Sequence, residues 1–203
     1  MCVSKETSLK VFLIGLLSSI VLYKNGEIYQ SICIFTISLL QLAEYFMWKD
    51  IKGESHVYKL GNLLGLLGLL LQTVGFRIII GKLDYIQYAN ILFFGYVIFK
   101  YIKAGYPKTT ETSNGHLRWG FWEVLTKRET IYGLLLYLIG LCSSGSTDGY
   151  RHPVYAVFIW AFLLLISINI TGSNIYSVDK WGSMWCYTSN MVGPILALQS
   201  LKI

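Results

Sequence analysis

The side chains best suited to chemistry are polar residues that lie within long apolar stretches of the sequence. Gln41, Glu44 and Trp48 follow one another at helical spacing near the end of the apolar stretch 28–48, so they share one face of a helix. A carboxylate inside an apolar helix needs water, a proton or a charged partner, and such residues often bind or move ions. Glu44 is therefore a candidate for coupling or ligand binding, with a structural ion pair near the surface as the alternative.

A second group of polar residues lies in the last apolar stretch of the chain. Ser183 and Asn190 share one stripe of this expected helix, Trp185 lies on the stripe beside it, and Lys180 precedes the stretch. We expect Lys180 to pair with Glu44, because both should lie near the same membrane surface. The polar cleft expected beside this pair is lined by Trp48, Asn62, Trp185 and Asn190.

Small residues mark one face of the apolar stretch 60–80. Such residues let the backbone of a neighbouring helix approach closely, so we interpret this face first as a packing surface. The alternative is a solute or ion pathway beside the smooth face, with Asn62 and Gln72 as its polar contacts. The residues of this face, at spacings of three and four, are Gly61, Gly65, Gly68, Gln72 and Gly75.

The amino-acid composition indicates whether the helices that carry these residues lie in water or in lipid. Of the 203 residues, 54% are hydrophobic and 14% are charged, whereas soluble domains carry about 25% charged residues. The mean hydropathy is +0.52. A helix of about 20 residues spans the hydrocarbon layer. We therefore predict an all-α bundle in one transmembrane domain, 1–203, with about seven spans at 9–23, 28–48, 60–80, 85–102, 131–144, 153–171 and 181–199.

The distribution of basic residues predicts the orientation of these spans. If the chain alternates between the two sides, twelve of the 17 Lys and Arg residues fall on the side of the N-terminus. Loops rich in Lys and Arg stay in the cytosol. We therefore expect a cytosolic N-terminus and an extracytosolic C-terminus. The twelve are Lys5, Lys10, Lys49, Lys52, Lys59, Lys100, Lys103, Lys108, Arg118, Lys127, Arg128 and Lys180.

The longest expected loop, 105–130, lies on the cytosolic side. Leu117, Phe121, Trp122 and Leu125 recur in it at helical spacing. This pattern predicts a short amphipathic helix in the headgroup layer, and a solvated loop with scattered aromatic residues is the alternative.

The sequence gives little support to other classes of function. Its net charge of +6 is explained by orientation in the membrane, so we expect no nucleic-acid partner. Motifs for phosphate loops, zinc proteases and serine hydrolases are absent, and the three histidines lie near loops. We expect no metal, no cofactor and no catalytic residues, and an enzymatic role is disfavoured.

Two short segments carry a family resemblance. Gln41-Leu42-Ala43-Glu44-Tyr45-Phe46-Met47-Trp48 and Trp181-Gly182-Ser183-Met184-Trp185-Cys186 resemble segments of uncharacterised multi-pass membrane proteins of large DNA viruses. The resemblance implies a multi-pass viral membrane protein, and it brings no established activity.

Three classes of membrane protein fit these observations. A transporter or channel for a small solute or ion is favoured, because Glu44, Asn62, Asn190 and the glycine face could line a pathway. A receptor-like or assembly protein that acts through helix contacts is the alternative, and a lipid-modifying enzyme is the second alternative. The expected partners are the lipid bilayer, a small solute or ion, and further copies of the chain or other membrane proteins. The sequence does not specify which membrane holds the protein.

Overall fold

The computed structural model describes residues 4–112, 115–144 and 192–201, and these are mostly α-helical. The all-α prediction is confirmed at this level. The helices are α1 (Lys5–Lys24), α2 (Ile28–Lys49), α3 (Val57–Ile79), α4 (Tyr85–Lys103), α5 (Lys127–Ser144) and α8 (Val192–Ser200). The connection between α4 and α5 contains the antiparallel strands β1 (Thr110–Glu111) and β2 (Leu117–Arg118) and the 3-10 helix η1 (Gly120–Val124).

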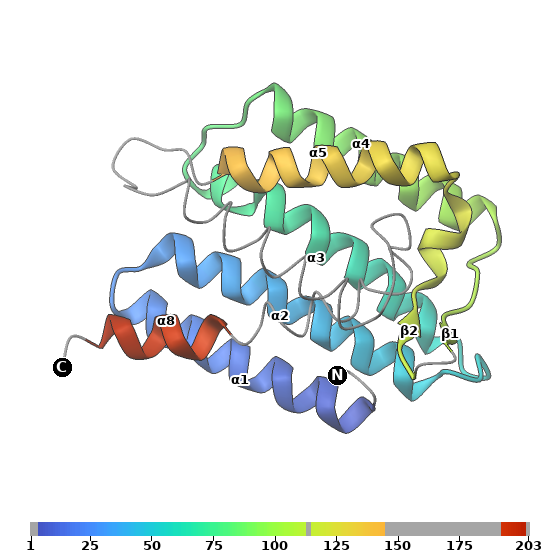
Figure 1. Cartoon of the computed structure of the whole chain (residues 1–203), viewed down its shortest axis with the longest axis horizontal. Helices are drawn as coiled ribbons and strands as arrows, with labels where there is room; N and C mark the ends of the chain where they lie inside the picture. Colours follow the sequence, from blue (N-terminus) through green and yellow to red (C-terminus); the bar gives the residue numbers. More distant parts are fainter. Residues whose placement is uncertain (1–3, 113–114, 145–191, 202–203) are drawn as a thin grey trace.

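The long helices run side by side in the order α1, α2, α3, and then α4 and α5 (Figure 1). Consecutive helices are antiparallel, and α8 packs against α1 and α2. We call end A the end of the bundle where α1, α3 and α5 begin and where the β-hairpin lies. End B is the opposite end, where α2 and α4 begin. The first described residues and the end of α8 therefore lie at opposite ends of the bundle.

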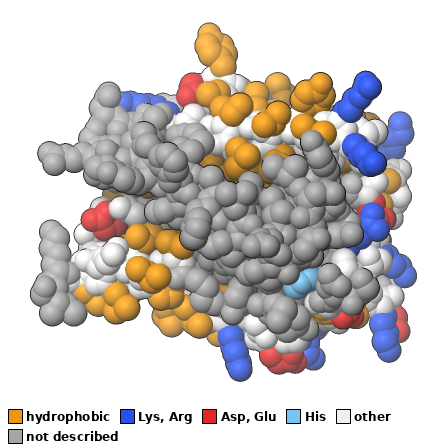
Figure 2. Space-filling model, viewed as in Figure 1, with side chains coloured by type: hydrophobic (Ala, Val, Ile, Leu, Met, Phe, Trp, Pro, Cys, Tyr) orange, Lys and Arg blue, Asp and Glu red, His pale blue; other side chains and the backbone are white. Residues whose placement is uncertain are grey.

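Three helices, α1, α2 and α3, are long and apolar enough to cross a membrane. They are consistent with an integral membrane protein. Large apolar side chains are exposed along the helices, including Leu17 on α1, Leu92 on α4 and Leu198 on α8. Figure 2 shows hydrophobic side chains along both long edges of the bundle, where lipid would cover them.

The helix ends differ from the expected spans in ways that local signals explain. The expected span 131–144 is short, but α5 begins at Lys127 because Thr126 and Glu129 cap its first turn.

The expected span 153–171 lies outside the described residues, and the span 181–199 is described only from Val192 onward. The number of seven spans therefore stays a prediction.

The glycine face of α3 packs against α2, as the sequence predicts. A Cβ atom on Gly61 would lie 2.8 Å from the backbone oxygen of Ala43, and one on Gly68 would lie 2.7 Å from a methyl group of Leu40. The contact at Gly61 is with backbone, which cannot turn aside, so glycine permits the approach there, whereas at Gly68 the Leu40 side chain would have to shift. A Cβ on Gly75 would find ordinary contacts, the nearest at 3.6 Å.

The expected amphipathic helix within 105–130 is a wrong prediction. Residues 117–118 form strand β2, and only Gly120–Val124 is helical, as a 3-10 turn. Leu117 and Phe121 are fully buried, and both belong to the same core cluster as residues of α2, α3 and α4. The aromatic residues of this segment therefore pack inside the protein at end A. Burial there removes more of their apolar surface from water than the headgroup layer would.

A charged contact joins α4 and α5 near end A. Lys100 donates to both carboxylate oxygens of Glu129 at 3.0 Å, and Tyr96 donates its hydroxyl hydrogen to one of them. The backbone N–H of Thr126 donates to Glu129 at 2.7 Å, while the N–H of Glu129 donates to the Thr126 hydroxyl. This reciprocal pair is a capping box at the start of α5.

We expect this contact to make the stability of the protein depend on pH. The hydrogen bond from Tyr96 and those from Thr126 and Lys100 lower the pKa of Glu129 from 4.5 to about 2. A carboxyl group whose pKa is lower in the folded state stabilises that state above pH 4.5 and loses the effect as the pH falls toward 2. Glu129→Gln should lower the free energy of unfolding by about 1 kcal/mol at neutral pH. It should also flatten the pH dependence of thermal unfolding in detergent between pH 4.5 and 2. An unchanged pH profile in this variant would contradict the assignment.

Candidate functional site

The predicted functional residues of α2 lie inside the bundle near end A. Glu44 and Gln41 are fully buried, and Trp48 is half-buried. Glu44 lies five residues before the last residue of α2, which places it about 7.5 Å below that end of the helix. Burial of a carboxylate at this depth is costly, and the role of Glu44 in coupling or ligand binding stays a prediction.

The other half of the predicted cleft comes from the last apolar stretch of the sequence. Lys180, Ser183, Trp185 and Asn190 lie outside the described residues. The pairing of Glu44 with Lys180 therefore stays a prediction.

Asn62, which the sequence assigned to a solute pathway, makes a set of internal hydrogen bonds. Its side-chain N–H groups donate to the backbone oxygen of Tyr58 at 2.9 Å and to the hydroxyl of Thr109 at 2.8 Å. Its side-chain oxygen accepts from the backbone N–H of Phe121 at 3.2 Å. Asn62 thus fastens both sides of the β-hairpin segment to α3, and these bonds occupy its donors.

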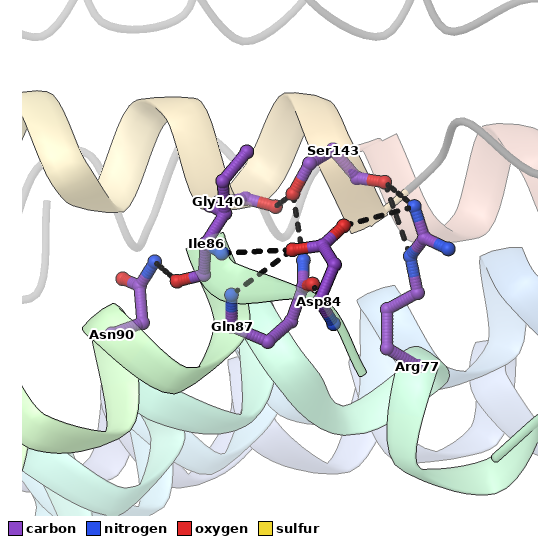
Figure 3. A network of polar contacts seen from close by, with 7 residues as sticks. All are labelled: Arg77, Asp84, Ile86, Gln87, Asn90, Gly140 and Ser143. Carbon is purple, nitrogen blue, oxygen red and sulfur yellow. Dashed lines mark hydrogen bonds and ion pairs between the residues drawn. The ribbon is translucent and has the colours of Figure 1, made fainter. Parts of the chain in front are cut away.

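A second polar group lies between α3, α4 and α5 (Figure 3). Its members come from all three helices and from the turn that joins α3 to α4. We call it the polar column. It consists of Gln72, Thr73, Arg77, Asp84, Gln87, Asn90, Tyr137, Gly140 and Ser143.

The outer part of the column joins three helix ends at end B. The Arg77 side chain donates to the backbone oxygen of Ser143 at 3.2 and 2.6 Å, and it lies 3.8 Å from the Asp84 carboxylate. The Arg77 side chain is only 10% exposed. A guanidinium at the last carbonyls of α5 and a carboxylate at the start of α4 are both favoured by the helix dipoles.

Local sequence explains how Asp84 and Gln87 are held. The Asp84 carboxylate accepts from the backbone N–H groups of Ile86 and Gln87 at 2.9 and 3.4 Å. The Gln87 side-chain oxygen accepts from the backbone N–H of Asp84 at 3.1 Å, which completes a capping box at the start of α4. The amide nitrogen of Gln87 then donates to the Ser143 hydroxyl at 2.7 Å.

The inner part of the column lies deeper in the bundle. Asn90 donates from its amide nitrogen to the backbone oxygens of Ile86 at 3.0 Å and Leu136 at 3.2 Å. Tyr137 donates its hydroxyl hydrogen to the side-chain oxygen of Gln72. Gln72 lies seven residues before the last residue of α3, so the column reaches about 10 Å into the bundle from end B.

The two polar groups offer carboxyl, amide, hydroxyl and guanidinium groups. Glu44 can hold a proton or a cation, and the amides of the column can hydrogen-bond a neutral polar molecule. Within the described ranges, no three His, Cys, Asp or Glu side chains lie close enough together to hold a metal ion.

Comparison with known protein families, curated proteins and solved structures finds no match to this chain. The resemblance to viral membrane proteins therefore stays a prediction. Of the column, the sequence singled out only Gln72; the other members were missed because they belong to separate helices, and Arg77 and Ser143 are 66 positions apart. The one available signal was Asp84 followed by Gln87, a spacing typical of a helix start.

Proposed function

We propose that the chain is a multi-pass membrane protein that passes a small polar solute or an ion across the bilayer. This proposal rests on one observation: buried polar side chains extend into an apolar bundle from both of its ends. Glu44 enters from end A, and the polar column enters from end B as far as Gln72. Polar groups are costly inside a membrane protein and are concentrated along solute and ion pathways.

The basic residues support the orientation that we propose for this pathway. Lys52 and Lys108 are neighbours at end A. The side-chain amine of Lys108 donates to the backbone oxygen of Lys52 at 3.5 Å. Figure 2 shows Lys and Arg side chains gathered on the right, over the end that carries the β-hairpin. We propose that end A faces the cytosol and that seven spans complete the bundle.

Proton flux is the first test of this function, because a buried carboxyl group can carry a proton. Purified protein is placed in vesicles that contain the pH-sensitive dye pyranine, and a pH gradient is imposed under a clamped membrane potential. We expect proton entry to exceed that of protein-free vesicles, and Glu44→Gln to abolish the excess. Glutamine keeps the shape of the side chain but cannot release a proton.

A matched control is available on the same helix. Glu27 lies at the start of α2, outside the bundle interior, so Glu27→Gln should leave the flux unchanged. The swelling of vesicles in urea or glycerol, followed by light scattering, tests neutral solutes in the same preparation. If neither protons nor these solutes cross faster than in protein-free vesicles, the transport proposal fails. A stable membrane partner that co-purifies without flux would then favour the assembly alternative.

A further inference from the structure

Three helices come into direct contact at Gly140, in the inner part of the polar column. A Cβ atom on Gly140 would lie 2.6 Å from the amide nitrogen of Asn90 and 2.9 Å from the Cβ of Thr73. One turn earlier on α5, Tyr137 contacts Gln72, the residue next to Thr73. Tyr137 and Gly140 are about one helical turn apart on α5, so Gln72 and Asn90 both border the same interface of α5.

Each of these two side chains has a buried polar atom without a partner among the residues that the structure describes. These atoms are the amide nitrogen of Gln72 and the side-chain oxygen of Asn90. Gln72 is 5% exposed and Asn90 is 0% exposed. Leaving such groups without a hydrogen bond costs about 1–3 kcal/mol each.

Exchanging the oxygen and nitrogen positions of either side-chain amide does not give every polar atom a partner. Asn90 uses both of its N–H groups on backbone oxygens of Ile86 and Leu136, which fixes its own oxygen as the free atom. Within the described part of the chain, the Gln72 side chain makes a single hydrogen bond, to Tyr137. Whichever way its amide is turned, one polar atom is left over.

We propose that Gln72 and Asn90 form a buried water site between α3, α4 and α5, which exchanges with the solvent at end B. Water is neutral, and it can accept from the Gln72 amide nitrogen and donate to the Asn90 oxygen. Buried waters in proteins characteristically bridge polar groups that lack other partners. The close contact of the three helices at Gly140 leaves little space, which favours water over a larger solute.

The outer column provides the route to the solvent. From Asn90 toward end B the interface continues with the hydroxyl of Ser143, the amide of Gln87 and the charged pair Arg77 and Asp84 (Figure 3). The Asp84 side chain is 42% exposed, so the column opens at the surface. This water site does not require that a solute crosses the membrane.

Hydroxyl-radical footprinting of the intact protein in detergent tests the proposal. Radicals generated from bound water modify the nearest side chains, and Tyr137 lies beside the proposed site. Tyr101 is the control, because it is also buried and its hydroxyl donates to the backbone oxygen of Pro107 at 3.3 Å. We expect Tyr137 to be modified several-fold faster than Tyr101. Equal rates would overturn the proposal.

Substitution of Asn90 tests whether the modification of Tyr137 comes from the proposed water site. Asn90→Leu removes the free oxygen and keeps the number and branching of the side-chain heavy atoms, and it should reduce the modification of Tyr137 to the level of Tyr101. Leu92→Ala, on the exposed side of the same helix, should leave it unchanged. Fast modification that persists in Asn90→Leu would overturn the role of Asn90. Since the footprint does not depend on flux, a protein that labels as expected but transports nothing would contradict only the transport proposal.

Discussion

Replacing Asn62 with leucine is expected to destabilise the protein strongly. The side chain is fully buried, and it holds the Thr109 hydroxyl and the backbone N–H of Phe121. Leucine would leave both of these buried groups without a partner. Each orphaned group costs about 1–3 kcal/mol, so we expect a loss of about 2–6 kcal/mol in the free energy of unfolding. Thermal unfolding in detergent, followed by circular dichroism, measures this loss.

The matched control removes only one of these bonds. Thr109→Val replaces the hydroxyl with a methyl group, so it should cost about 1 kcal/mol. Limited proteolysis adds a local measurement, because the segment between α4 and α5 should be cleaved faster in Asn62→Leu than in Thr109→Val. If Asn62→Leu were as stable as the unchanged protein, the fastening role of Asn62 would be wrong.

Helices α2 and α3 could be predicted closely from the sequence. The expected span 28–48 corresponds to Ile28–Lys49, and the span 60–80 corresponds to Val57–Ile79. Long apolar runs identify helices in a membrane protein because the backbone must satisfy its own hydrogen bonds there. The packing face of α3 could also be predicted, since small residues at helical spacing have one common use.

The partners of the polar side chains could not be predicted in the same way. Asn62 looks like a lining residue from its position in an apolar run, yet its partners Thr109 and Phe121 are 47 and 59 positions away. Local spacing carries no information about contacts over such distances. The same limit hid the polar column, because Asn90 and Leu136 are brought together only when α4 and α5 pack.

The segment between α4 and α5 shows how a correct local pattern led to a wrong element. Leu117, Phe121 and Leu125 do recur at helical spacing, but a helix would separate Phe121 from Asn62 and leave the core between α2, α3 and α4 unfilled. Burial of Leu117, Trp119 and Phe121 in one cluster contributes more than a short surface helix could. Tertiary packing therefore overrides the local pattern.

Substitution of Gly120 by alanine is expected to displace this same segment. A Cβ atom on Gly120 would lie 2.0 Å from the backbone oxygen of Pro107 and 2.8 Å from its carbonyl carbon. Both atoms belong to the backbone, so no side-chain rotation can relieve the clash. Overpacking of a core usually costs about 1–3 kcal/mol, and a clash with backbone should reach the upper part of that range. We expect a lower thermal midpoint in detergent and faster proteolysis of the chain between α4 and α5.

Gly95→Ala provides the matched control, since no atom of the described residues lies within 4 Å of a Cβ placed on Gly95. Gly95 lies in the interior of α4, where alanine is favoured over glycine by about 0.5–1 kcal/mol. This variant should therefore be as stable as the unchanged protein or slightly more stable. The expected changes in stability have opposite signs for the two substitutions. This difference distinguishes a steric clash at Gly120 from a general effect of adding a methyl group. If Gly120→Ala unfolds at the same temperature as Gly95→Ala, the close approach of η1 to Pro107 is wrong.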